Sequence, residues 1–224
     1  MTTLEPSPHW PSFDELAVAA STCTKCPLAE TRTQVVFGAG NPHASLVFVG
    51  EGPGAEEDRQ GIPFVGRAGQ LLTRLIEGIG LTRDDVYICN VVKCRPPGNR
   101  DPLPAEIESC RPYLEAQLDF LAPRVVVTLG NFATRLLLGT KDGITKLRGK
   151  EFPYRGDQAV LMPTLHPAAV LRNGGTALAQ ARADFVLVKR ALAAARAVRG
   201  GVALQQSSKE AEEARKVLFG QRAR

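Results

Sequence analysis

Four short apolar runs recur along the chain and predict the strands of a central sheet. They are rich in valine, leucine and isoleucine and are bounded by glycine or proline, a pattern typical of strands buried on both faces. Between them, apolar residues recur every three or four positions, which predicts amphipathic helices. The runs cover residues 46–50, 86–92, 124–130 and 159–167, and the helices cover 13–20, 68–80, 105–122, 131–139 and 177–199.

Strands that alternate with helices indicate a parallel sheet with helices on both faces. The sequence therefore predicts one α/β domain around a central, mostly parallel four-stranded sheet, and we place this domain at residues 13–198. Residues 1–12 form a polar N-terminal segment, and residues 199–224 predict a flexible polar tail because the apolar periodicity ends there. The glycine- and proline-rich segments 51–66 and 93–104 predict loops.

Length and charge narrow the class of protein. A chain of 224 residues forms one sizeable α/β domain with a real core. Its formal net charge of +5 favours a polyanionic partner such as DNA. No apolar run is long enough to cross a bilayer, and the N-terminus lacks the basic-then-apolar order of a signal peptide. We therefore expect a soluble, intracellular protein that does not bind membranes.

The segments that follow the predicted strands hold the most informative residues. In parallel α/β sheets, ligands bind beyond the carboxyl ends of the strands. EGPG follows the first run, residues 90–102 end and follow the second, and HPAAV follows the fourth. We expect these three segments to meet at one edge of the sheet and to form a site there.

Five cysteines, an odd number in a chain expected to be intracellular, argue against a disulfide framework. Cys23 and Cys26 form a C-x2-C pair, while fifteen residues separate Cys94 from Cys110. Four thiolates suit a tetrahedral zinc ion or an iron–sulfur cluster equally well, and free structural thiols are a third alternative. Cys89 lies inside the second apolar run, where we expect a core residue.

Three longer motifs and the order of the cysteines resemble the family 4 uracil-DNA glycosylases, the iron–sulfur type of bacteria and archaea. The motifs are GEGPGAEEDRQGIPFVGRAGQLL, NVVKCRPPGNRDP and HPAAVLR, and the resemblance covers about residues 14–195. It implies a structural [4Fe–4S] cluster in a loop region, held by Cys23, Cys26, Cys94 and Cys110. It also implies a monofunctional DNA repair glycosylase that flips uracil out of DNA and hydrolyses its N-glycosidic bond, leaving an abasic site for base excision repair.

Two related groups resemble the chain less well. Family 5 enzymes carry an alanine-rich first motif with few acidic residues, whereas this chain has Glu51 in GEGPG. Another iron–sulfur group traps itself covalently on DNA through a histidine in a basic insertion after the second strand. Here no histidine lies between His43 and His166, so we expect no such trap.

Excision requires an enzyme to hold the flipped base by its face and edge and to stabilise the charge that develops. The resemblance implies that Phe64 stacks on uracil, that Asn90 reads its edge, and that His166 donates a hydrogen bond to the anion on O2. As residue types alone, a phenylalanine and a histidine are also common in protein cores, and an asparagine is common at turns.

The first motif supplies the other candidate site residues. Glu51 is implied as a catalytic group that positions water or offsets positive charge on the sugar. The backbone of Gly52 can approach the base closely because no side chain intervenes. Glu57 is implied to line the pocket near uracil C5, although an acidic run by itself is typical of a solvated loop.

The resemblance implies uracil-containing DNA, single- or double-stranded, as the partner of a monomer at the nucleoid in the cytoplasm. Apolar side chains of residues 168–171 would fill the stack that the flipped base leaves. Two alternatives remain: a non-catalytic iron–sulfur or zinc DNA-binding protein of the same fold, and a redox protein whose cluster carries electrons. Four arginines are expected to contact DNA: Arg95, Arg100, Arg148 and Arg172.

Overall fold

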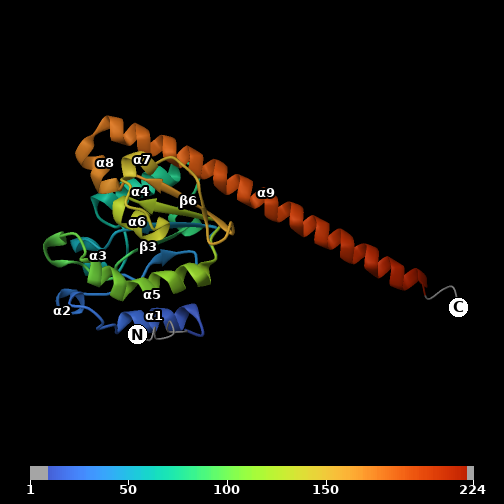
Figure 1. Ribbon diagram of the computed structural model, residues 1–224, viewed down its shortest axis with the longest axis horizontal. Helices are drawn as coiled ribbons and strands as arrows, with labels where there is room; N and C mark the ends of the chain where they lie inside the picture. Colours follow the sequence, from blue (N-terminus) through green and yellow to red (C-terminus); the bar gives the residue numbers. More distant parts are fainter. Residues whose placement is uncertain (1–9, 221–224) are drawn as a thin grey trace.

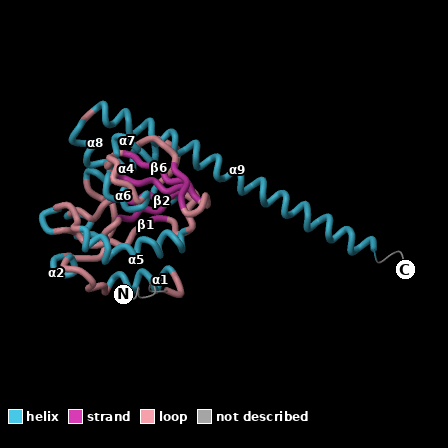
Figure 2. Tube along the Cα trace, in the orientation of Figure 1, coloured by secondary structure: helices cyan, strands magenta, loops and turns pink. Residues whose placement is uncertain are grey.

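A six-stranded sheet forms the centre of the molecule, in the order β1-β3-β2-β4-β6-β5 (Figures 1 and 2). The computed structural model describes residues 10–220, and for residues 198–220 it describes the backbone alone. Most of the predicted N-terminal segment 1–12 thus lies outside the described residues. The strands are β1 (Ala39–Gly40), β2 (Leu46–Gly50), β3 (Tyr87–Asn90), β4 (Val125–Leu129), β5 (Phe152–Tyr154) and β6 (Ala159–Thr164).

The prediction of a mostly parallel sheet is confirmed, but the prediction of four strands omits two. The four apolar runs form β3, β2, β4 and β6, which pair in parallel. The omitted strands β1 and β5 pair antiparallel at the two edges. Each is only two or three residues long and too short to show periodicity, and Pro153 within β5 is typical of an edge strand.

Helices cover both faces of the sheet, as predicted (Figure 1). One face packs against α4 (Arg67–Glu77), α8 (Pro167–Asn173) and the start of α9 (Gly175–Gly220), and the other against α5 (Pro104–Leu121) and α6 (Asn131–Leu138). Helix α1 (Phe13–Ser21) packs outside α5. Strand side chains alternate between the two cores, with Phe48 and Ile88 in the first and Val47 and Cys89 in the second. Cys89 is therefore a core residue, as expected.

Four short helices lie where the sequence predicts loops or no element: α2 (Leu28–Thr31), α3 (Ala55–Gln60), α7 (Ile144–Leu147) and α8. In α3, the helix-forming residues 55–60 lie between two glycines, and Gly61 ends the helix with a φ of +71°. Helix α8 begins with His166 as its N-cap and Pro167 in its first turn, so the proline starts a helix rather than a loop.

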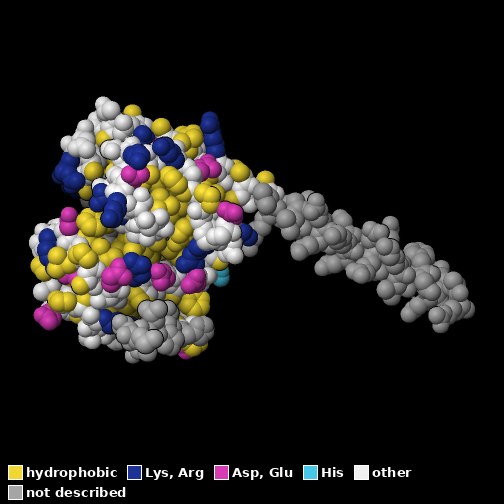
Figure 3. Space-filling view, viewed as in Figure 1, with side chains coloured by type: hydrophobic (Ala, Val, Ile, Leu, Met, Phe, Trp, Pro, Cys, Tyr) yellow, Lys and Arg dark blue, Asp and Glu magenta, His cyan; other side chains and the backbone are white. Residues whose placement is uncertain are grey.

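Helix α9 continues to Gly220, beyond the predicted helix end at residue 199. Residues 221–224 lie outside the described part of the chain, and the flexibility of the tail stays a prediction. None of the described helices is both long and apolar enough to span a membrane. On the face shown in Figure 3, Lys and Arg side chains are spread among hydrophobic ones over the globular part of the chain.

Candidate active site

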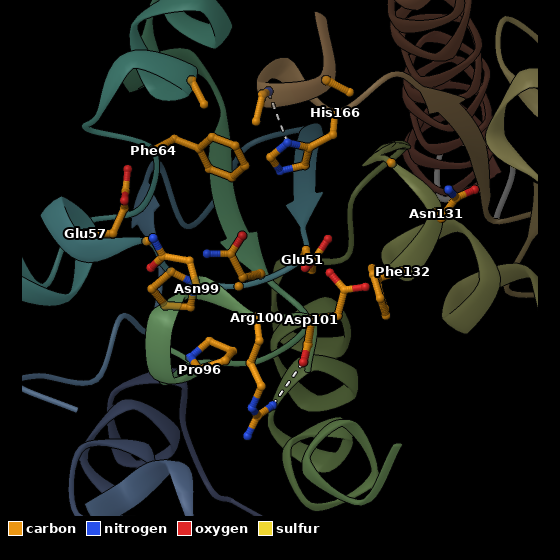
Figure 4. A pocket seen from close by; sticks show the side chains of 18 of the residues that line it. Glu51, Glu57, Phe64, Pro96, Asn99, Arg100, Asp101, Asn131, Phe132 and His166 are labelled. Atoms are coloured by element: carbon orange, nitrogen blue, oxygen red, sulfur yellow. Dashed lines mark hydrogen bonds between the residues drawn. The ribbon is translucent and has the colours of Figure 1, made fainter. Parts of the chain in front are cut away.

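A cleft of about 600 Å³ lies at the carboxyl ends of the four parallel strands (Figure 4). Residues 51–54 after β2, 96–101 after β3, 130–132 after β4 and 165–169 after β6 all contribute to its lining. The structure brings every predicted site residue other than the cysteines to this cleft. These are Glu51, Gly52, Glu57, Phe64, Asn90 and His166.

Phe64 forms one wall of the cleft and has a strained backbone. Its φ is +54°, a left-handed value that a bulky residue adopts at a cost of about 1–3 kcal/mol. The ring lies 5.8 Å from that of His166, between centroids, and Figure 4 shows the two rings facing each other. Phe64 is also 6% exposed and packs in the first core, so its backbone strain, rather than its exposure, favours a functional position.

Asn90 ends β3 beneath the cleft and is 1% exposed. Its Oδ1 atom is buried and has no hydrogen-bond partner among the described residues. A buried acceptor without a donor costs about 1–3 kcal/mol, so its place in a cleft favours a ligand that brings an N–H. Gly50 makes room for it, because a Cβ there would lie 2.4 Å from Asn90 Oδ1 and 2.6 Å from the Phe64 ring.

His166 is a neutral hydrogen-bond donor. Its Nδ1 accepts a hydrogen bond of 3.2 Å from the backbone N–H of Ala168, so its proton is on Nε2. Burial, helped by the positive charge of Arg172, lowers the pKa of His166 to about 4. The side chain therefore caps α8 with one nitrogen and keeps an N–H on the other across the neutral pH range.

Glu51 lies beside a second carboxylate, Asp101, and near Arg172 (Figure 4). Burial first, and the charge of Asp101 second, raise the pKa of Glu51 to about 7, while Arg172 opposes the shift. A carboxylate that titrates near neutral pH is suited to accept a proton from water. Asp101 has no role predicted from sequence, where its only signal is its place inside the NVVKCRPPGNRDP motif.

Glu57 lines the cleft and also holds a loop. Its Oε1 accepts hydrogen bonds of 2.9 Å from the backbone N–H groups of both Val65 and Gly66. Gly52 lies in tight packing, since a Cβ there would be 2.7 Å from Val92 Cγ2. Gly52 lines the cleft, and the close approach of its backbone to a base stays a prediction.

The four candidate DNA-contacting arginines separate into two groups. Arg100 and Arg172 line the cleft, whereas Arg95 and Arg148 do not. Arg148 donates to the buried Asp184 on α9, with an Nη2–Oδ1 distance of 2.6 Å. Its expected contact with DNA is not supported, because its donors stabilise the fold instead.

The four cysteines of the two predicted pairs line one small cavity. Cys23 and Cys26 come from the loop between α1 and α2, Cys94 follows β3, and Cys110 lies on α5. Two N–H groups donate to sulfur at 3.3 Å: the Arg32 side chain to Cys94 and a backbone N–H to Cys110. None of the five cysteines, all of which lie in the described part of the chain, forms a disulfide bond.

No compact site for a single metal ion is found where side chains are described. Among residues 10–197, no three Cys, His, Asp or Glu side chains converge closely enough to hold one metal ion. Four thiolates around one cavity suit a tetrahedral zinc ion or an iron–sulfur cluster.

Lys93 joins the cysteine cavity to the cleft. It lines that cavity, is 1% exposed, and its Nζ donates to the backbone oxygen of Asn90 at 2.7 Å and to Gln117 Oε1. No carboxylate pairs with it within the described part of the chain. A buried ammonium is costly unless negative charge lies nearby, and four thiolates around a cluster would supply that charge.

Comparisons with known proteins show which family the sequence matches. Residues 37–192 match the sequence profile of the uracil DNA glycosylase superfamily. A type-4 uracil-DNA glycosylase of Thermotoga maritima is 53% identical over 152 residues, 67% of this chain and 79% of that protein. One from Archaeoglobus fulgidus is 46% identical over 166 residues, 71% and 83% of the two chains. A type-5 enzyme of Pyrobaculum aerophilum is 37% identical over 114 residues, 44% and 50% of the two chains.

Proposed function

Because this chain belongs to the uracil DNA glycosylase superfamily, we propose that it excises uracil from DNA in the cleft at the carboxyl ends of β2, β3, β4 and β6. It is a DNA repair enzyme, a hydrolase of N-glycosyl bonds like its type-4 relatives. One observation carries the assignment of the cleft: the buried, unpartnered Oδ1 of Asn90 beside the strained Phe64. A flat ring with an N–H on its edge fits both side chains.

The edge of uracil matches the groups that Asn90 offers. Uracil has an N3–H donor between two carbonyl oxygens, whereas cytosine lacks that hydrogen and carries an amine at C4. Asn90 Oδ1 accepts from uracil N3–H while its amide donates to O4, so the same side chain disfavours cytosine. Phe64 stacks on the face of the base, which contributes about 1–3 kcal/mol.

Bond cleavage leaves negative charge on the base and positive charge on the sugar. The Nε2–H of neutral His166 donates to uracil O2 and stabilises that charge more in the transition state than in the ground state. Glu51 orients the attacking water and offsets the sugar charge, and the Gly52 backbone lies close to the base. Glu57 is proposed to lie near uracil C5, and it also holds the loop that carries Phe64.

DNA, single- or double-stranded, is the proposed partner. Arg172 lies at the cleft with no ion pair of its own in the described part of the chain, so it remains free to bind a phosphate. Leu171 on α8 is exposed, and an apolar side chain at that position can fill the stack vacated by the flipped base. A monomeric state and a cytoplasmic location at the nucleoid stay predictions.

Release of free uracil from a synthetic oligonucleotide tests this function. We expect the purified chain to convert a uracil-containing strand to an abasic product and to leave matched strands with cytosine or thymine intact. Single- and double-stranded substrates, assayed side by side, give the strand preference. Tight binding of the uracil strand without release would contradict the proposal and favour the non-catalytic DNA-binding alternative.

We further propose that the four-cysteine cavity holds a [4Fe–4S] cluster, with Cys23, Cys26, Cys94 and Cys110 as ligands. The sulfur-directed N–H donors support it, as does the charge of Lys93, which no carboxylate balances within the described chain. The cluster would cross-link the α1–α2 segment to the connection between β3 and α5. Since that connection also lines the cleft, the cluster supports the site as a scaffold.

Substitution of single cysteines distinguishes ligands from core thiols. Purified wild-type protein should be brown, and Cys94→Ser should lose nearly all its iron and colour and melt at a lower temperature. Cys89→Ser is the matched control, because Cys89 is buried in β3 away from the cavity lining and should keep its iron. Iron analysis, visible absorption and thermal melting report the result. Colourless wild-type protein with one zinc ion per chain would contradict the prediction.

The dependence of excision on pH should report Glu51. Its carboxyl acts in the ionised form, so the single-turnover rate should rise with pH through a midpoint near 7, the value of its raised pKa. His166 stays neutral over this pH range, so it adds no second inflection to the plot of rate against pH. Glu51→Gln should flatten the profile and lower the plateau, and Asp101→Asn should move the midpoint to lower pH, because Asp101 raises the pKa of Glu51.

The stability of the folded chain should fall as the pH rises through the pKa of Glu51, whereas the excision rate should rise. Its pKa in the folded chain lies above the ordinary value of 4.5, so the folded chain binds this proton more tightly than the unfolded chain does. Stability therefore falls as the pH rises from about 4.5 through 7. Glu51→Gln should raise the melting temperature at pH 8 while it lowers activity; a flat activity profile in wild-type enzyme would remove Glu51 from the mechanism.

A further inference from the structure

The loop that carries Phe64 is held by an arginine outside the cleft. Arg83 begins the 3-10 helix η1 (Arg83–Asp85) and is half-buried against the loop. Its Nη2 donates to the backbone oxygen of Pro63 at 2.7 Å, and its Nη1 donates to the backbone oxygen of Phe64 at 3.1 Å. One guanidinium thus binds two successive carbonyls, which fixes the orientation of the peptide groups on either side of Phe64 Cα.

An anionic side chain holds the other half of the same loop. Glu57 accepts from the backbone N–H groups of Val65 and Gly66, both at 2.9 Å. Gly69 packs directly against the loop. Only glycine fits there, because a Cβ would lie 1.8 Å from the Phe64 oxygen. Two carbonyls and two amides around one strained residue are therefore bound by side chains of opposite charge.

This arrangement explains how a bulky residue keeps a left-handed backbone. Without outside contacts, Phe64 would relax toward negative φ and its ring would leave the wall of the cleft. Burial lowers the pKa of Arg83 from its usual value, while Asp84 and Glu57 oppose that shift. An arginine nevertheless remains protonated at neutral pH, so the cationic contact persists.

We propose that Arg83 is a positioning residue for base stacking: together with Glu57, it fixes the Phe64 ring in place before the flipped base arrives. The inference rests on the proposed role of Phe64 as the ring that stacks on uracil. A ring already fixed in its bound orientation loses no conformational freedom when the base binds, and this preorganisation raises affinity for the extrahelical base. Arg83 itself does not line the cleft and touches no substrate.

A double-mutant cycle between Arg83 and Phe64 tests the proposal. Arg83→Met keeps the aliphatic stem and removes every donor. Uracil excision is measured in single turnovers, with enzyme in excess of the DNA but below the concentration that saturates binding. We expect the rate of Phe64→Ala to fall about 10- to 100-fold, the range that base stacking provides. Arg83→Met should lose about 10-fold in the wild-type background but less than about twofold in the Phe64→Ala background. Arg83→Lys, which keeps a donor and the charge, should restore part of the loss.

Arg155→Met is the matched control, because Arg155 also donates to a backbone carbonyl and pairs with a carboxylate but lies away from the cleft. It should excise at the wild-type rate. Equal losses from Arg83→Met in both backgrounds, or a full-rate Arg83→Met enzyme, would overturn the proposal. A full-rate Phe64→Ala enzyme would also overturn it, while the glycosylase assignment would stand. A wild-type chain that releases no uracil would overturn the glycosylase assignment and the role of Arg83 together. Thermal melting of each variant separates positioning from unfolding, since the loss must exceed any change in the folded fraction.

Discussion

His166→Ala should slow single-turnover excision of uracil by about 10²–10³-fold while it leaves DNA affinity nearly unchanged. The side chain supplies one preorganised donor, Nε2–H, to an oxygen that becomes charged only as the glycosidic bond breaks. Such a donor contributes little to ground-state binding and much to the transition state. The neutral form required for this role is secured by burial, which lowers the pKa of His166 to about 4.

The second nitrogen of His166 complicates the alanine variant and provides its control. Nδ1 caps α8 by accepting from the Ala168 N–H, and loss of a cap costs about 1 kcal/mol of stability. His166→Asn keeps an acceptor suited to an N-cap, but its shorter side chain cannot place its amide N–H where the Nε2–H of histidine lies. We expect His166→Asn to be as slow as His166→Ala and more stable. Equal losses of stability and activity in both variants would identify a structural histidine, and a fast His166→Asn would remove the donor from the mechanism.

Asn90→Ala should lower the rate of uracil excision about 100-fold with little loss of stability. Two hydrogen bonds to the base are removed, and bonds of this kind contribute about 1–1.5 kcal/mol each. The fold should tolerate the change because Oδ1 has no partner in the protein, and Lys93 binds the main-chain oxygen of Asn90, which the substitution leaves in place. A structural asparagine would show the reverse, a lower melting temperature at a preserved rate.

Asn90→Asp refines the same test. An oxygen in place of the amide nitrogen faces uracil O4 without a hydrogen to donate, yet it can accept from the C4 amine of cytosine. The ratio of uracil to cytosine excision should therefore fall by more than the rate on cytosine rises. Parallel single-turnover assays on both substrates measure it, and an unchanged ratio would show that the base edge is read by other groups.

The parts of this fold that the sequence predicts are those set by local pattern. The apolar runs identify β2, β3, β4 and β6 because strands buried on both faces must be apolar along their whole length. Edge strands β1 and β5 carry no such pattern, since their two or three residues depend on pairing with a neighbour. The sequence predicts a loop where α3 lies, because glycines often mark turns. Here Gly54 and Gly61 instead cap the two ends of the helix.

The residues of the candidate site also fall into those that sequence could indicate and those that it could not. Glu51, Asn90 and His166 each follow or end a strand, where ligands bind in this type of sheet, and the family resemblance implies their individual roles. Asp101 and Arg83 act through neighbours distant in sequence, namely the Glu51 carboxyl and the carbonyls around Phe64. No spacing rule connects them, because the contacts exist only after the chain has folded. The ion pair of Arg148 with Asp184 was likewise beyond sequence, because the two residues meet only in the folded chain, and its contact with DNA stays a prediction.

The lining of the cleft by segments after four separate strands has a consequence for biosynthesis. The first lining segment of the cleft, residues 51–54, leaves the ribosome long before the last lining segment, residues 165–169. Strand β6 must also pair with β4 before His166 reaches Phe64. A nascent or partly unfolded chain therefore has no complete pocket for a base.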